Sequence, residues 1–205
     1  MKTVELFSGT GSFSNVAKEL GHEIHRIEMN TEFEAELHAD MLDVKSLPEC
    51  DIIWASPPCT GFSVAAMGHC WNDFREPKSN SAVLGMKLLE QTIKLIAAAK
   101  PKYWFIENPR GMMRKKITRL FIKNGLDPWR HTITYCQYGD TRMKPTDIWT
   151  NCTEWKSRVP CSPGANCHEA APRGSKTGTQ GLKDNMERSI IPPALFHEIF
   201  GDIVE

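Results

Sequence analysis

The feature that most constrains this chain is its alternation of short apolar strands with amphipathic helices. The predicted strands are Thr3–Phe7, His22–Glu28, Asp51–Trp54, Lys102–Ile106, His131–Cys136 and Asp147–Thr150. The predicted helices are Phe13–Leu20, Val83–Ala99, Lys116–Lys123 and Pro192–Ile203, and residues 60–80 are predicted to form a long loop. Such alternation favours an α/β fold, with a mostly parallel sheet and helices on both of its faces.

Residues that could bind a ligand follow several of the predicted strands. Gly9 and Gly11 form a Gly-x-Gly turn after the first strand, and Glu28 ends the second. Such a turn exposes the N–H groups of a helix N-terminus, and an acid at the second strand end commonly binds ribose hydroxyls. Because ligands of parallel sheets bind beyond the carboxyl ends of strands, we predict a nucleoside-type cofactor at this edge.

Two further strand ends carry reactive groups. Cys59 ends the sequence Ser-Pro-Pro-Cys, in which two prolines stiffen the backbone. A cysteine on such a turn is placed like a nucleophile, although a buried structural cysteine is the alternative. Glu107 follows a later strand, where partial desolvation would raise the pKa of its carboxyl and let it bind a ring nitrogen.

Three motifs taken together resemble the cytosine-5 DNA methyltransferases. They are ELFSGTGSF at 5–13, SPPC at 56–59 and ENP at 107–109, and the resemblance covers residues 3–110 and resumes at 136–149 and 188–200. It implies a Rossmann-like, S-adenosylmethionine-dependent methyltransferase fold. It also implies a DNA cytosine-5 methyltransferase, a small phage-like member of the family with a reduced target-recognition region.

The resemblance also implies roles for individual residues. The thiolate of Cys59 would attack C6 of a flipped cytosine, and methyl would pass from S-adenosylmethionine to C5. Glu107 would hold N3 and the exocyclic amine, and Asn108 would brace the Cys59 loop. The sequence departs from the family's Gln-x-Arg-x-Arg pattern, so the cation that helps bind cytosine stays open between Arg142 and Lys144. The expected cofactor-binding residues are Phe7, Ser8, Gly9, Thr10, Gly11, Ser12, Glu28, Met29, Asp40, Met41, Pro57, Ser189 and Ile190.

The chain divides into three expected parts. Residues 1–150 form a catalytic and cofactor-binding α/β domain, 151–187 a short, irregular, Cys-rich recognition segment, and 188–205 a C-terminal helix that returns to the catalytic domain. The middle part has almost no apolar residues and therefore needs a staple. We predict a zinc site in this part, and the alternative is a set of free thiols. The four expected ligands are Cys152, Cys161, Cys167 and His168.

The charge distribution favours double-stranded DNA as a partner of the second half. The net charge is zero, but the first 60 residues contain 4 basic and 11 acidic residues, whereas residues 100–188 contain 17 basic and 8 acidic ones. His69, Trp71 or Phe74 would fill the gap left by a flipped base. The expected DNA contacts are Phe62, Ser63, Arg173, Ser175, Lys176 and Gln180.

Other classes of protein are excluded or left open. The sequence lacks an apolar run of the roughly 18 residues that a membrane span needs, and it shows no secretory signal. An odd number of cysteines, seven, fits a reducing compartment. We expect a monomer in the cytoplasm of a bacterial or phage-infected host cell, with a partner protein left open. Two alternative functions also stay open: an RNA or nucleotide cytosine-5 methyltransferase, and a catalytically silent DNA-binding protein on the same fold.

Overall fold

The computed structural model describes residues 1–170, 172, 182 and 184–204. The strands are β1 (Lys2–Leu6), β2 (Glu23–Glu28), β3 (Leu37–His38), β4 (Ile52–Ala55), β5 (Tyr103–Pro109), β6 (Trp129–Thr134) and β7 (Pro145–Thr150). The helices are α1 (Ser12–Glu19), α2 (Met67–Cys70), α3 (Asn80–Ala99), α4 (Met113–Lys123), α5 (Asn185–Ser189) and α6 (Pro193–Val204). Two short 3-10 helices are η1 (Val64–Ala66) and η2 (Tyr135–Tyr138).

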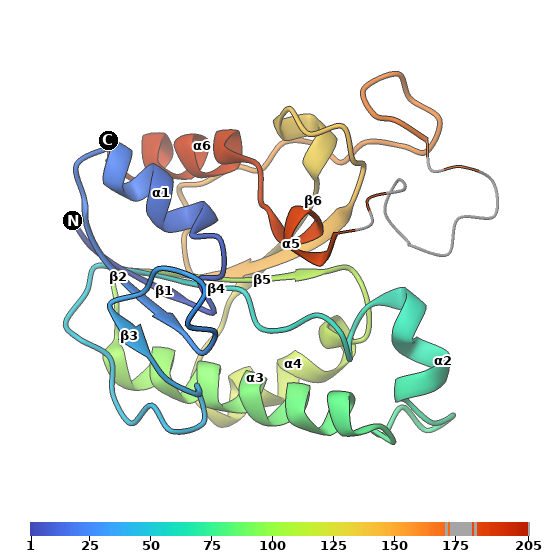
Figure 1. Ribbon diagram of the computed structural model, residues 1–205, viewed down its shortest axis with the longest axis horizontal. Coiled ribbons are helices and arrows are strands. Elements are labelled where there is room, and N and C mark those ends of the chain that lie inside the picture. Colours follow the sequence, from blue (N-terminus) through green and yellow to red (C-terminus); the bar gives the residue numbers. More distant parts are fainter. Residues whose placement is uncertain (171, 173–181, 183, 205) are drawn as a thin grey trace.

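The strands form one sheet in the order β3-β2-β1-β4-β5-β7-β6. The first five in this order are parallel, whereas β7 runs antiparallel to both β5 and β6. Helices α1 and α6 cover one face and α3 and α4 the other (Figure 1). The mostly parallel sheet with helices on both faces is therefore confirmed, with an antiparallel addition at one end.

The central strands are buried on both sides. In β4, Ile53 and Ala55 belong to the core that contains α3 and α4, and Ile52 and Trp54 belong to the core that contains α1 and α6. Successive side chains of a strand point to opposite faces, so one apolar run fills two cores. This explains why these strands appear in the sequence as continuous apolar runs.

Most element boundaries agree with the sequence, and the differences have local causes. Helix α3 starts at Asn80 instead of Val83 because the Ser79 hydroxyl accepts a hydrogen bond from the N–H of Ala82 and caps the helix. The expected loop 60–80 contains the short helices η1 and α2. Strand β6 ends before Cys136, which lies in the η2 turn.

Helix α1 begins on a buried carboxylate that the sequence reasoning missed. The two carboxylate oxygens of Glu5 accept hydrogen bonds from the N–H groups of Phe13 and Ser14, at 3.2 and 2.9 Å. These bonds satisfy two of the free N–H groups at the helix N-terminus. Burial nevertheless raises the pKa of Glu5 to about 7. Glu5 of β1 thus fixes the N-terminus of α1, which directly follows the Gly-x-Gly turn.

Part of the expected DNA-binding set falls outside this description. Arg173, Ser175, Lys176 and Gln180 are not among the described residues. Within the described residues, no helix combines the length and apolar character that crossing a bilayer requires.

Replacing Glu5 with Gln should flatten the pH dependence of stability. The pKa of about 7 lies above the ordinary value of 4.5, so the folded protein keeps a proton that the unfolded chain releases between these values. The free energy of unfolding should therefore fall by about 3 kcal/mol as pH rises through this window, and by less in Glu5→Gln. Urea unfolding at pH 5 and pH 8 measures the difference. Glu49→Gln, whose side chain is 92% exposed, is the control, and the same fall in all three proteins would contradict this prediction.

Candidate active site

The loop after β4 holds Cys59 at the carboxyl edge of the sheet. The indole N–H of Trp54 donates to the Ser56 hydroxyl at 2.9 Å. The side-chain amide of Asn108, at the end of β5, donates to the carbonyl of Pro57 at 2.8 Å. This is the contact expected of a residue that braces the loop. Cys59, two residues after Pro57, is exposed.

Two glycines let this loop pass between neighbouring backbones. A Cβ at Gly111 would lie 2.1 Å from the carbonyl oxygen of Phe62, and one at Gly61 would lie 2.9 Å from the backbone of Ala82 in α3. The carbonyl of Phe62 also accepts a hydrogen bond from the N–H of Met112 at 2.7 Å. The Cys59 loop is therefore held directly against the segment that follows β5.

Glu107 lies beside this loop and is only 5% exposed. Its carboxylate accepts a hydrogen bond from the Tyr135 hydroxyl at 3.1 Å. Burial raises the pKa of Glu107, while the positive charge of Lys144 and hydrogen bonds from Tyr135 and Ser56 oppose the rise. A carboxyl with a raised pKa keeps its proton to a higher pH than a free one and can share it with a ring nitrogen.

Charge also couples Cys59 to its neighbours. Desolvation raises the pKa of the Cys59 thiol, and so does the negative charge of Glu107. The positive charges of Lys144 and Arg188 lower this pKa. Desolvation lowers the pKa of Lys144, while Glu107 and Cys59 raise it. The ammonium group thus stabilises both potential anions of the site.

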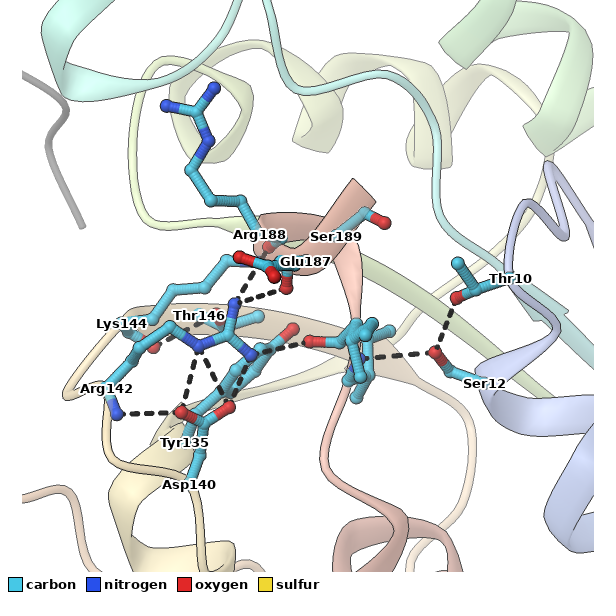
Figure 2. Close-up of polar contacts among 12 residues, drawn as sticks. Thr10, Ser12, Tyr135, Asp140, Arg142, Lys144, Thr146, Glu187, Arg188 and Ser189 are labelled. Carbon is cyan, nitrogen blue, oxygen red and sulfur yellow. Dashed lines mark hydrogen bonds and ion pairs between the residues drawn. The ribbon is translucent and has the colours of Figure 1, made fainter. Parts of the chain in front are cut away.

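Arg142 is occupied elsewhere. Its Nε donates to both carboxylate oxygens of Asp140 at 2.9 Å, and its Nη2 also pairs with that carboxylate. Its terminal nitrogens donate to the carbonyls of Glu187, Arg188 and Ile190 at 3.0, 3.1 and 2.9 Å. Figure 2 shows the guanidinium between Asp140 and the return segment, residues 187–191. All five donors of the guanidinium are used, so in this structure Arg142 holds the return segment beside Asp140 and has no N–H left for a further partner.

Lys144 is the cation whose charge acts on both Cys59 and Glu107. Its ammonium lies 4.7 Å from the centre of the Tyr135 ring and donates to the carbonyl of Arg188 at 2.9 Å. Tyr135 was missed by the sequence reasoning, where the only available signal was its position near the end of a predicted strand.

The loop after β1, residues 7–12, is the one expected to bind the cofactor, and we call it the cofactor loop. Its backbone is left-handed at three positions. Phe7, Gly9 and Gly11 adopt positive φ angles of 59°, 47° and 70°. Left-handed backbone at a non-glycine residue such as Phe7 is strained and typical of functional turns. The Glu28 carboxylate accepts the N–H of Gly9 at 3.0 Å and that of Asn30 at 2.9 Å, and its remaining lone pairs can accept ribose hydroxyls.

Several groups next to this loop fit a polar nucleoside cofactor. The buried hydroxyl of Ser8 has no hydrogen-bond partner among the described residues. The Ser12 hydroxyl accepts a hydrogen bond from the N–H of Ile191 at 3.2 Å and lies 3.3 Å from the Thr10 hydroxyl (Figure 2). The return segment is therefore attached to the cofactor loop on one side and to Arg142 on the other. A pocket of about 260 Å³ lies between this segment and α1.

The remaining expected cofactor residues differ in accessibility. Asp40 accepts the N–H of Leu42 at 2.9 Å, while the side chain of Met41 packs in the core and offers almost no surface. Pro57 is also buried, whereas the other three are exposed: Met29, Ser189 and Ile190.

Phe62 was expected to contact DNA, but its ring is fully buried. It packs against Trp71, which is itself 3% exposed, because the loop has folded onto α3. Trp71 is therefore also unsuited to fill the space of a flipped base in this structure. Ser63 pairs with Gly111 beside the loop, and Phe74 is 86% exposed.

The expected zinc ligands are only partly brought together. Cys161, Cys167 and His168 converge, but their fourth neighbour is Cys136. Cys152 is fully buried elsewhere and its thiol donates to Glu154. The set with Cys152 is therefore wrong, because the chain turns at η2 and presents Cys136 to this cluster instead.

Comparison with solved structures shows the fold. A methyltransferase from Entamoeba histolytica, EhMeth, is similar with a TM-score of 0.54 and 20% identity over 78% of this chain and 55% of its own. The Dnmt2 methyltransferase of S. pombe has a TM-score of 0.50 and 15% identity over 78% of this chain and 51% of its own. This chain spans about half the length of these structures, and the likeness shows a Rossmann-like methyltransferase fold.

Sequence comparison identifies the family. The model of the C-5 cytosine-specific DNA methylases matches residues 1–124, and this chain belongs to that family. A protein of Frog virus 3 (isolate Goorha), named "Probable DNA (cytosine-5)-methyltransferase", is 27% identical over 224 residues, which cover 97% of this chain and 98% of that protein. S-Adenosylmethionine is the cofactor of this family.

Substituting Gly111 with Ala should destabilise the protein and displace the Cys59 loop. The added Cβ meets backbone that cannot rotate away, so we expect a loss of about 1–3 kcal/mol in the free energy of unfolding. Urea unfolding measures this loss. Gly68→Ala is the matched control, because a Cβ there meets nothing within 4 Å. Equal stability of the two variants would show that the loop can move away without cost.

Replacing Arg142 with Gln should weaken cofactor binding, because the return segment would lose charged hydrogen bonds that hold it beside Ser12. We expect the Kd for S-adenosylmethionine, measured by calorimetry, to rise about tenfold or more. Arg119→Gln, on an exposed position of α4, should leave it unchanged. Normal cofactor binding with loss of cytosine binding would instead make Arg142 a substrate contact.

Proposed function

We propose that this protein methylates C5 of cytosine in double-stranded DNA, with Cys59 as the nucleophile. The observation that carries the proposal is the convergence of Cys59, Glu107 and Lys144 at one edge of a methyltransferase sheet. These three groups come from different segments of the chain and influence one another's charge. Family membership supports the reaction type.

Cys59 acts on C6 of the cytosine ring, and Lys144 acts on Cys59. The Cys59 thiolate forms a bond to C6, which makes C5 nucleophilic. Because the pKa of the free thiol is raised, the thiolate depends on the nearby ammonium of Lys144. Lys144 is therefore the cation that we assign to the target pocket, in preference to Arg142.

Glu107 holds the opposite side of the ring. Its carboxyl, with a raised pKa, can donate a hydrogen bond to N3 and accept one from the exocyclic amine. This interaction favours electron flow into the ring when the sulfur adds. Asn108 keeps the Cys59 loop at the required place through Pro57.

S-Adenosylmethionine supplies the methyl group when bound. The residues that we assign to it are the loop from Phe7 to Ser12, the Glu28 carboxylate, and the return segment at Ser189 and Ile190. The unpartnered hydroxyl of Ser8 and the left-handed turns support this assignment. After methylation, the C5 proton passes to solvent water, and cleavage of the C6–sulfur bond restores the aromatic ring and the Cys59 thiolate.

The DNA duplex meets the basic second half of the chain. Residues 1–150 are the catalytic part and 151–187 the recognition part, although α5 crosses the expected boundary at 187/188. Phe74, exposed in the loop after α2, is the aromatic side chain that we assign to the space vacated by the flipped cytosine. We further propose a zinc ion that is bound in part by the recognition part.

The decisive experiment compares the parent protein with Cys59→Ser. Each is incubated with labelled S-adenosylmethionine and unmethylated DNA, RNA or dCMP in parallel. The products are digested to nucleosides and analysed by mass spectrometry. We expect 5-methyl-deoxycytidine from DNA with the parent protein and at least a thousandfold less with the variant, because serine is a much weaker nucleophile.

Cys50→Ser is the matched control and should keep the parent's activity, because Cys50 lies just before β4, at the opposite end of that strand. Methylation of RNA or dCMP alone would replace the substrate. Methyl on adenine or on N4 of cytosine would overturn the role of Cys59, and no product with any substrate would favour a binding protein.

A further inference from the structure

We propose that Cys136, Cys161, Cys167 and His168 bind one structural zinc ion, which fastens the segment after β7 to the wall of the catalytic site. This assigns the ligands and the role of the zinc ion proposed above. The ligand assignment does not depend on methyl transfer, because it rests on a separate group of side chains.

The distances fit a single tetrahedral ion. Zinc bonds of about 2.3 Å to sulfur and about 2.0 Å to nitrogen place neighbouring ligand atoms roughly 3.5–3.8 Å apart. The Sγ atoms of Cys136 and Cys167 are 3.7 Å apart, and Nδ1 of His168 lies 3.7 Å from Cys167 and 3.4 Å from Cys161. The Sγ atoms of Cys161 and Cys167 are 3.2 Å apart, and all four atoms lie within 4.8 Å of one another.

The alternative arrangements of these thiols explain less. A disulfide requires sulfur atoms about 2.05 Å apart, and all three cysteines are free. Three thiols and an imidazole from two separate parts of the chain have no reason to meet at this spacing without a shared ligand. Four protein ligands also close the coordination sphere, which is typical of structural and not of catalytic zinc.

Neighbouring groups support the thiolates. The side-chain amide of Gln137 donates to the sulfur of Cys167 at 3.4 Å. The N–H of Cys161 donates to the Thr134 hydroxyl at 2.8 Å, which fixes this ligand next to the end of β6. Outer contacts of this kind orient metal ligands and raise the affinity of the site.

The exposed part of the segment, residues 162–169, gains most from a metal ion. Residues 151–170 contain no helix or strand, and most residues from 162 to 169 are exposed. Exposed, irregular chain gains little from apolar burial, so metal binding can supply the free energy that orders it. The N–H of Glu169 donates to the carbonyl of Thr141 at 2.8 Å, so the far end of this segment is also docked.

The site lies one residue from the catalytic pocket. Cys136 directly follows Tyr135, whose hydroxyl donates to Glu107. The zinc ion would therefore join the pocket wall to the segment that leads, in the sequence, to Arg173 and Lys176. We expect its loss to weaken DNA binding while leaving the cofactor loop intact, because the cluster contains no residue of that loop.

The test measures metal content in the whole protein, purified under reducing conditions without chelator. We expect about one zinc per chain by mass spectrometry, and, after replacement by Co²⁺, the absorption of tetrahedral thiolate coordination. Cys136→Ser should lower zinc affinity by more than the roughly 10- to 100-fold that loss of an outer contact costs. Cys152→Ser should keep the parent's affinity, because Cys152 lies outside the cluster.

Cys50→Ser provides a second control, since Cys152 is buried and its substitution can destabilise the fold. Three results would overturn the assignment: no zinc retained even after zinc is added, loss of zinc in Cys152→Ser with retention in Cys136→Ser, or iron and sulfide in place of zinc.

The role has its own readout. Cys136→Ser should bind S-adenosylmethionine within about twofold of the parent protein but bind a DNA duplex about tenfold more weakly. Equal effects on both ligands would contradict a role in holding the recognition segment, even if zinc is present. Because zinc content is measured separately, failure of methyl transfer leaves the metal assignment intact.

Discussion

Ala55 of β4 pairs with Ile106 of β5 in parallel register, so the loop that carries Cys59 and the residue Glu107 leave the sheet at the same edge. The antiparallel strand β7 then brings its first residues to this edge, because it runs in the opposite direction to β5. Lys144 directly precedes β7 for this reason. Strand β6, antiparallel to β7, delivers Tyr135 to the same place. The reactive groups are therefore neighbours through strand direction, although they are far apart in the sequence.

This arrangement confines several charges in a small, partly dry volume. Glu107 is buried beside Lys144 and Tyr135, and the fully buried Asp147 is neutralised by Arg114, whose Nε donates to it at 2.8 Å. A buried carboxylate is costly unless it is paired and hydrogen-bonded. Pairing with Lys144 and with Arg114 keeps the carboxylates of Glu107 and Asp147 in fixed positions. It also explains why the pKa values of Glu107, Cys59 and Lys144 depend on one another.

Local sequence patterns predicted much of this arrangement. Apolar runs identified the strands, and the Gly-x-Gly turn, Glu28, Cys59 and Glu107 were found because each follows a predicted strand. The cation of the site could not be predicted in this way. Arg142 and Lys144 lie two residues apart in an irregular segment, where no periodicity sets the direction of a side chain. In the structure, Asp140 and the return-segment carbonyls take Arg142, which leaves Lys144 to the pocket.

The proposed zinc ligands also show that sequence patterns do not predict contacts between distant residues. Cys136 was placed in a predicted strand and so was not counted, while Cys152 was counted because it is near Cys161 in sequence. By itself, the sequence determined the α/β class, the cofactor turn and the candidate nucleophile, because these depend on patterns within a few residues. Only the tertiary structure decided which cation faces Cys59 and which cysteines converge. Those outcomes depend on strand direction and on turns that bring distant residues together.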